Sequence, residues 1–164
     1  MAKKLLVLCM AVVMAVVALV AGCGSTEQKA ASDSKVLKVG TNADFAPFEF
    51  QDENGKEYQG FDMDLIRAIG EEMGYKVEIS NIQFDGLIPA IQAGNIDVAI
   101  TGMTINEERK QNVLFSDPYY KSGLSIIVAK DNNDIKTFQD LKGKKVAVQI
   151  GTTSAAEVNK IGGV

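Results

Sequence analysis

The sequence predicts an α/β fold in which helices cover a parallel β-sheet. Short apolar segments with strand character alternate with amphipathic segments of helical period, in the order strand, helix, strand, helix, strand. The alternation then begins again, which predicts a second unit of the same kind. With 164 residues the chain is long enough for one ordinary domain. We therefore expect one α/β unit and the start of another.

The first predicted strand covers Val36–Gly40, an apolar run typical of a buried strand. A hairpin follows it. Residues 48–50 and 57–59 flank the sequence Asp52-Glu53-Asn54-Gly55, in which Asn-Gly is a strong turn signal.

The first predicted helix begins near Asp62, which we expect to cap it. Its apolar side chains recur at helical spacing, namely Leu65, Ile66, Ile69 and Met73. Gly74 stands where a helix-ending glycine should. Residues 76–79 alternate as a second strand.

A second helix is predicted after Asp85, the expected cap, with Pro89 early enough to be tolerated. Its apolar face would consist of Leu87, Ile88 and Ile91. Residues 97–101 predict a third buried strand. Ligands of parallel sheets bind beyond the carboxyl ends of the strands, so the loops after the three strands should converge on a site.

The second unit is predicted as a strand at 125–129, a short helix at 137–141, a strand at 145–149 and a helix from Thr152 to Lys160. These elements are too few to close a second sheet. We therefore expect the chain to be a fragment of a longer protein.

Residues 1–22 have the pattern of a signal peptide. Lys3 and Lys4 precede an uncharged apolar run that ends in small residues. The alternative is a membrane-spanning helix, for which the run is slightly short. Val20-Ala21-Gly22-Cys23 resembles a bacterial lipobox, which implies a lipid on Cys23 and anchoring outside the cytoplasm. A plain secreted protein with an incidental cysteine is the alternative.

Residues 23–35 are small and polar and predict a flexible tether. Cys9 lies in the segment to be removed, so no disulfide is expected in the mature chain. Without residues 1–22 the chain has 15 basic and 21 acidic residues, a net charge of −6 that offers nothing to nucleic acid. The absence of histidine excludes Ser-His-Asp and Cys-His catalysis and the commonest zinc sites.

Gly60-Phe61-Asp62-Met63-Asp64-Leu65 matches the signature of the family-3 solute-binding proteins, the amino-acid-binding group of bacterial periplasmic receptors. The chain resembles this family over nearly all of Val36–Thr153. Further motifs follow in the family's order, at 42–50, 101–109, 115–120 and 146–153. The resemblance implies the type II periplasmic-binding-protein fold, with two α/β lobes joined by a hinge. Lobe 1 would cover 36–122, and residues 123–164 would hold the hinge, near 122–125, and the start of an incomplete lobe 2.

A carboxylate site is expected around Arg109. Thr104 and Glu107 fit a capping box at a helix start, where free amides and the helix dipole favour an anion. Arg109, one turn further, can form two parallel charge-assisted hydrogen bonds with a carboxylate. The family resemblance implies this role for Arg109 and Thr104. In the alternative, Arg109 pairs with Glu107 or Glu108 on a solvated helix.

The resemblance extends the ligand site to further residues. It implies that Thr101, Gly102 and Thr104 contribute to the shell around the ligand, with the oxygens of Thr101 and Thr104 taking part of its ammonium. The charged partner of that ammonium usually belongs to the later part of lobe 2. Thr152 and Thr153 would reach the carboxylate from the opposite side, with a plain helix cap as the alternative.

Phe45 and Phe84 resemble the two aromatic residues that sandwich the ligand side chain, with core packing as the alternative; Phe48 and Phe50 are assigned to the core. Asn42 and Gln149 resemble positions that read the ligand side chain. Because both are amides, we favour a polar, glutamine-like ligand.

Asp62 and Asp64 open a helix, so we assign them to its structure and expect no metal or acid–base pair there. The expected function is capture of a free amino acid by a monomer for an ABC permease, without chemistry or cofactor. One alternative is a dehydratase on the same fold, which would need a general acid; no isolated buried carboxylate stands out in the sequence. Another is the sensor domain of a receptor.

Overall fold

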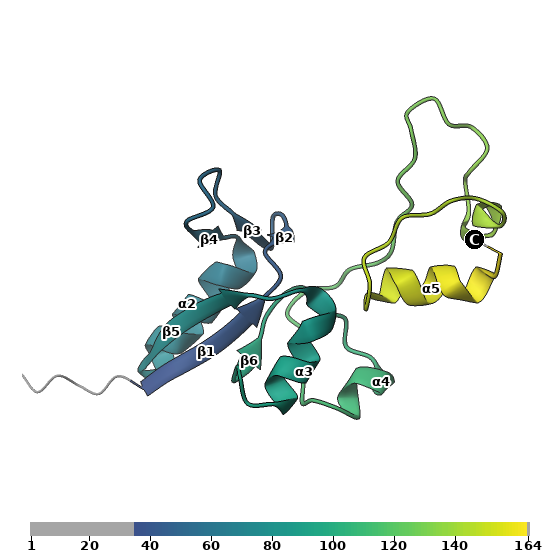
Figure 1. Ribbon diagram of the computed structural model, residues 1–164. Coiled ribbons are helices and arrows are strands. Elements are labelled where there is room, and N and C mark those ends of the chain that lie inside the picture. Colours follow the sequence, from purple (N-terminus) through teal and green to yellow (C-terminus); the bar gives the residue numbers. More distant parts are fainter. Residues whose placement is uncertain (1–34, 164) are drawn as a thin grey trace, which may run out of the picture. The chain divides into compact units, whose positions relative to one another are not determined.

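The computed structural model describes residues 35–163 (Figure 1). The predicted signal peptide, the predicted lipidation site Cys23 and all of the predicted tether except Lys35 lie outside the described residues. None of the helices within residues 35–163 combines the length and hydrophobicity that a membrane-spanning segment needs.

A three-stranded parallel sheet forms the first half of the described chain (Figure 1). β1 (Lys35–Thr41) lies in the middle, between β5 (Tyr75–Asn81) and β6 (Val98–Ala99). The seven residues of β1 pair one by one with the seven of β5. The first two predicted strands are confirmed, and the third is confirmed in a shorter form.

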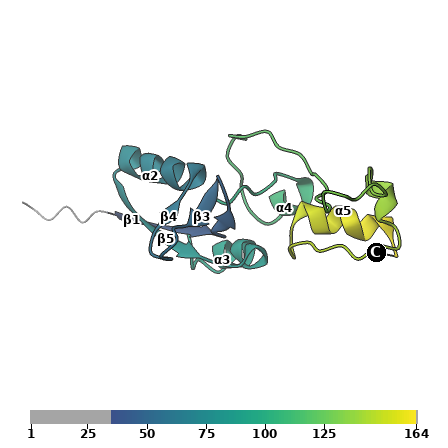
Figure 2. The same cartoon turned by 90° about the horizontal axis from the view of Figure 1, so that it is seen from above.

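Two helices lie on opposite sides of this sheet, as the view from above shows (Figure 2). α2 (Phe61–Met73) packs against β5, whereas α3 (Leu87–Gln92), which follows the 3₁₀ turn η1 (Phe84–Gly86), packs against β1 and β6. The buried core cluster consists of Val39, Met63, Ile66 and Ile100. Both predicted helices are confirmed, and Gly74 ends α2 in the left-handed conformation, at φ 72°.

A small antiparallel sheet precedes α2. Its strands are β2 (Asp44–Phe45), β3 (Glu49–Gln51) and β4 (Tyr58–Gln59), so the predicted hairpin is confirmed. Asp52 organises the loop between β3 and β4. Its carboxylate accepts hydrogen bonds from the backbone N–H groups of Lys56 and Glu57, at 2.6 and 3.0 Å. These backbone donors hold the pKa of the Asp52 carboxyl below its usual value.

Two predicted helix caps are wrong. α2 begins after Gly60 without a side-chain cap, and Asp62 lies inside the first turn. Its carboxylate instead accepts hydrogen bonds from distant segments, because it is fully buried beside them. Asp85 makes no capping bond either, since it lies within η1 and Gly86 precedes α3.

Residues 111–163, which we name the distal region, contain two helical elements in the described chain. These are the 3₁₀ turn η2 (Phe138–Leu141) and α5 (Thr153–Ile161), and both agree with the predicted helices. The strands predicted at 125–129 and 145–149 do not form. A strand requires a hydrogen-bonding neighbour, and neither segment has one within residues 35–163.

Candidate functional site

The carboxyl ends of β1 and β6 meet at one edge of the sheet, as a parallel arrangement requires. The backbone N–H of Asn42, directly after β1, donates a hydrogen bond to the Thr101 hydroxyl at 3.1 Å. Both residues are buried. Two predicted ligand-binding residues are thus fixed side by side at the edge where ligands of such sheets bind.

Arg109 lies on α4 (Glu107–Lys110) and is buried, with 7% of its surface exposed. Its guanidinium donates one hydrogen bond to the Thr104 carbonyl (Nη1, 2.7 Å) and another to the Gly151 carbonyl (Nη2, 3.0 Å). The alternative of an ion pair on a solvated helix is therefore wrong. The neighbouring Glu107 pairs with Lys110 instead, at 2.8 Å.

The predicted capping box of Thr104 and Glu107 is also wrong. α4 begins at Glu107 with Asn106 as its cap, and the Asn106 side chain accepts a hydrogen bond from the Arg109 N–H at 2.8 Å. Thr104 lies two residues before this cap and is exposed. Its carbonyl, rather than its amide or hydroxyl, contacts the guanidinium.

Burial lowers the pKa of Arg109 from its usual value, although a guanidinium remains protonated in proteins. Its guanidinium contacts neutral carbonyls and the ring of Phe84, whose centroid is 5.3 Å from Cζ, while the Glu108 carboxylate acts on its charge without a direct ion pair. Within residues 35–163 no ion pair neutralises it. A buried cation without a directly paired carboxylate is costly, and an anionic ligand would offset that cost.

A cavity of about 160 Å³ adjoins this guanidinium. It is lined by Phe84, Asp85, Ile88, Met103, Glu108, Arg109, Asn112 and Gly151. Gly151 has a φ of 77° and approaches so closely that a Cβ there would lie 2.9 Å from the Cβ of Asp85. Only glycine fits this position, which brings its carbonyl to Arg109.

Thr152 caps α5, because its hydroxyl accepts a hydrogen bond from the Ala155 N–H at 3.2 Å and donates one to the Gln149 carbonyl at 2.7 Å. The helix-cap alternative therefore describes this side chain in the structure. The amides of Thr153 and Ser154 belong to the first turn of α5, where backbone donors have no partner within the helix. Backbone N–H groups of a first turn are directed toward the start of their helix, and the start of α5 follows Gly151.

Asn42 and Gln149, both predicted to read the ligand side chain, bond to each other. The Gln149 Nε2 donates to the Asn42 Oδ1 at 2.6 Å. Gln149 belongs to the distal region, 107 residues further along the chain. The two side-chain amides are thus in direct contact, although the segment around Gln149 forms no strand.

Phe45 is 56% exposed and stacks on Phe48, with ring centroids 5.7 Å apart. Its ring lies near Gly102, at which a Cβ would stand 3.5 Å from the ring. Core packing is therefore excluded for Phe45. Phe84 is half-buried beside Arg109, and no ring contact joins it to Phe45 in the described residues.

Glu49 is a buried carboxyl that sequence reasoning missed, with 1% of its surface exposed. It accepts a hydrogen bond from the Thr101 hydroxyl at 2.9 Å, so this hydroxyl already has a partner. The assignment of Phe48 and Phe50 to the core is wrong, because both are half-buried while Glu49 between them is buried. The prediction put the aromatic side chains on the buried face of β3, whereas the structure buries Glu49 on that face.

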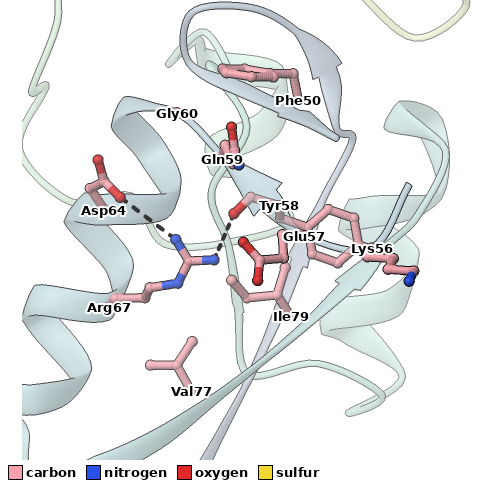
Figure 3. Close-up of a pocket in the computed structure, with 10 residues that line it drawn as sticks. All are labelled: Phe50, Lys56, Glu57, Tyr58, Gln59, Gly60, Asp64, Arg67, Val77 and Ile79. Atoms are coloured by element: carbon pink, nitrogen blue, oxygen red, sulfur yellow. Dashed lines mark hydrogen bonds and ion pairs between the residues drawn. The ribbon is translucent and has the colours of Figure 1, made fainter. Parts of the chain in front are cut away.

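A larger hollow of about 750 Å³ lies elsewhere, beside α2, β4 and β5 (Figure 3). Arg67 donates there to the Tyr58 carbonyl at 2.6 Å and pairs with Asp64 at 3.6 Å. Its guanidinium is exposed and has an anionic partner already. None of the predicted ligand-binding residues lines this hollow, so we place the candidate site at the smaller cavity beside Arg109.

Comparison with known proteins identifies relatives of the chain. Residues 37–161 match the family model of the bacterial extracellular solute-binding proteins, family 3. The arginine-binding extracellular protein ArtP of Bacillus subtilis is 40% identical over 130 residues, which are 79% of this chain and 50% of the relative. The chain thus spans about half the length of the curated relatives it matches.

Three solved structures resemble the chain closely. An ancestral arginine-binding protein bound to arginine is 55% identical with a TM-score of 0.76, over 79% of this chain and 58% of that protein. An ancestral arginine-binding protein bound to glutamine is 56% identical, with a TM-score of 0.74 over 77% and 56%. An ancestral amino-acid-binding protein, a precursor of cyclohexadienyl dehydratase, is 51% identical, with a TM-score of 0.72 over 77% and 56%.

The predicted fold class is confirmed: the chain is α/β and covers part of the type II periplasmic-binding-protein fold. The family match extends over most of the chain and includes most of β1 and all of β6, Arg109 and α5. The chain belongs to the bacterial extracellular solute-binding proteins, family 3.

Proposed function

We propose that this chain is the first half of an extracytoplasmic receptor that binds a free amino acid and delivers it to an ABC permease. The observation that supports it best is the buried Arg109 guanidinium, which has hydrogen bonds to carbonyls but no ion pair in the described chain. A carboxylate at this position would gain charge-assisted hydrogen bonds in a partly dehydrated place.

The α-carboxylate would lie between Arg109 and the start of α5. The first-turn amides of Thr153 and Ser154 point to this end of the helix, where the dipole favours an anion. Gly151 connects the two groups, since its carbonyl contacts the Arg109 guanidinium. This contact supports a carboxylate site that would take in Arg109, Thr152 and Thr153.

The ammonium would bind near the end of β6. The Thr101 hydroxyl is occupied by Glu49 and Asn42, which leaves the Thr101 carbonyl and the exposed Thr104 hydroxyl as acceptors. The Gly102 N–H donates to Asp62 at 2.9 Å, so Gly102 would contribute through its closeness to Phe45 rather than through its amide.

For the ligand side chain we propose a polar, glutamine-like group. Asn42 and Gln149 satisfy each other with one donor and one acceptor, and a ligand with both kinds of group can replace either of them. An ancestral arginine-binding protein of this fold has been solved with glutamine bound. The lipid anchor on Cys23, the monomeric state and the hinge near residues 122–125 are parts of the same proposal.

One observation favours an enzyme as a second candidate. A structural relative is a precursor of cyclohexadienyl dehydratase, and Glu49 is a buried carboxyl whose pKa burial raises to about 8. However, Glu49 is sealed from solvent and bonded to Thr101, so it would not reach a substrate. Turnover of a prephenate-like substrate by the complete receptor would favour the enzyme.

Calorimetry of the complete receptor against the twenty amino acids tests the proposal. We expect one or a few ligands of micromolar affinity or better. If none of the twenty amino acids binds, the proposed function is wrong.

Arg109→Ala should weaken binding of that ligand by about 1.5–3 kcal/mol or more, the scale of hydrogen bonds to charged groups. Arg67→Ala is the matched control, because Arg67 is the exposed guanidinium of the larger hollow and has Asp64 as its partner. Its affinity should equal that of the wild type. Equal losses in the two variants would remove Arg109 from the site.

A further inference from the structure

Two buried carboxyl groups lie beside Thr101 and Gly102. Glu49 of β3 and Asp62 of α2 are 1% and 0% exposed. One oxygen of each is hydrogen-bonded: Glu49 Oε1 accepts from the Thr101 hydroxyl, and Asp62 Oδ2 accepts from the Gly102 N–H, both at 2.9 Å. The pair therefore holds two consecutive residues of the proposed ligand site.

The other oxygen of each group has no hydrogen-bond partner within residues 35–163. These atoms are Glu49 Oε2 and Asp62 Oδ1. Two unpartnered acceptors on neighbouring buried acids would repel each other if both groups were ionised. A single proton between the two groups would satisfy both oxygens, because a protonated carboxyl donates one hydrogen bond.

The surroundings favour this arrangement. Burial is the largest cause that raises the pKa of Glu49, to about 8; the Asp62 carboxyl adds to it by charge and by hydrogen bonding, and Asp44 of β2 adds by charge. The Thr101 hydroxyl acts in the opposite direction. Tyr119 faces the pair from the distal region and donates its hydroxyl to Asp62 Oδ2 at 2.9 Å.

We propose that Glu49 and Asp62 share one proton and act together as positioning residues that hold Thr101 and Gly102 in place for the ligand. This inference rests on the proposed function for its consequence on binding, but the shared proton does not depend on it. In this arrangement the Asp62 carboxyl accepts from Gly102 and Tyr119, and the Glu49 carboxyl accepts from Thr101 and carries the shared proton.

Ligand affinity should therefore depend on pH. Loss of the proton places two negative charges against each other, and their separation would move Thr101, Gly102 or Tyr119. Because the folded pKa of Glu49 is about 8 and its unfolded value is 4.5, the pair is intact at neutral pH. Affinity should fall as the pH rises through about 8, by up to about tenfold per pH unit above it.

The same shift affects folding with a definite sign. The folded pKa of Glu49 lies above its unfolded value of 4.5. The stability contributed by the protonated form is fully present below that unfolded value and is lost as the pH rises through about 8. A purely structural pair would show this loss without a matching loss of ligand affinity at pH values where the receptor stays folded.

The first experiment needs no ligand. Carbon-detected NMR of the wild-type 164-residue chain follows the Glu49 carboxyl through a pH titration, and we expect a midpoint of about 8, well above the ordinary glutamate value of 4.5. A Glu49 midpoint in the ordinary range of glutamate would overturn the shared proton, whatever the receptor binds.

The second experiment measures affinity against pH in the complete receptor, with the amino acid found by calorimetry as the probe. Between about pH 7 and 8.5, before the ligand's own ammonium loses its proton, Glu49→Gln should keep near-wild-type affinity without a decline, because its amide donates without titrating. Asp64→Asn, which changes an exposed carboxyl on the helix that carries Asp62, should keep the decline. A decline that persists in Glu49→Gln would overturn the positioning role.

Discussion

The sheet region (residues 35–101) and the distal region (residues 111–163) have similar sequence patterns but different structures. In the sheet region three predicted strands pair with each other, and α2 and α3 cover them. In the distal region the predicted helical elements form, whereas the predicted strands at 125–129 and 145–149 do not. Helices satisfy their backbone groups locally, but strands depend on neighbours.

Exposed side chains show the same difference. Val39 and Met63 in the sheet region are fully buried, whereas Ile127 and Ile150 in the distal region are 96% and 70% exposed. A segment with strand-like side chains and an unpaired backbone can pair with any neighbouring strand that supplies the missing hydrogen bonds. The strand-like composition of 125–129 and 145–149 therefore indicates where further strands would pair.

The strongest test of this comparison is to study the full-length receptor. In the full-length protein, residues 125–129 and 145–149 should become paired strands, and their amides should exchange slowly with solvent. Its affinity for the amino acid should exceed that of the 164-residue chain by at least about 100-fold, or about 2.8 kcal/mol. Nanomolar binding by the 164-residue chain would contradict the proposal that it is the first half of a receptor.

A second test compares the stability of the two regions by side-chain truncation. Met63→Ala should lower the free energy of unfolding by about 2–5 kcal/mol, because it leaves a cavity in the core cluster. Ile127→Ala, an apolar truncation at an exposed place, should change it by no more than about 0.5 kcal/mol. Denaturant unfolding measures both variants. Similar losses would show that the distal region is packed as well as the sheet.

A third test concerns the cap of the 3₁₀ turn η2, where we expect a local effect. The Thr137 hydroxyl and the Asp140 carboxylate form a capping box at the start of η2, and the backbone donors of Lys136 and Thr137 lower the pKa of Asp140. Thr137→Ala should destabilise η2 locally by about 1 kcal/mol, seen as faster amide exchange at 138–141.

The control for this variant is Lys142→Ala, an exposed position at the other end of η2. It should leave exchange at 138–141 unchanged. In both variants the amides of β1 should exchange as in the wild type. Faster exchange in β1 after Thr137→Ala would mean that the two regions unfold as one.

The sequence predicted those parts of the fold that depend on local patterns. Helical spacing located α2, α3 and α5, and a glycine located the end of α2. The caps were harder to predict. Asp62 and Thr104 both have side chains that suit a cap, but Asp62 is buried against Gly102 and Asn106 lies nearer to the start of α4.

The candidate site was predicted in its residues but not in its contacts. The resemblance to the family pointed to Arg109, Asn42 and Gln149, whereas their bonds to Gly151 and to each other depend on segments far apart in the sequence. Glu49 was missed because two phenylalanines flank it, and the pattern of β3 alone favours burial of the aromatic side chains.

The hydrogen bonds from Arg109 to two main-chain carbonyls have a consequence for selectivity. In the proposed receptor, a solute would have to replace these carbonyls as acceptors of the guanidinium, so its affinity would depend on how much better an acceptor it is than a neutral carbonyl. An ionised carboxylate has that advantage, whereas an amide-capped amino acid resembles the acceptor it would displace. The two main-chain carbonyls would thus set the strength that a solute has to exceed in order to bind at Arg109.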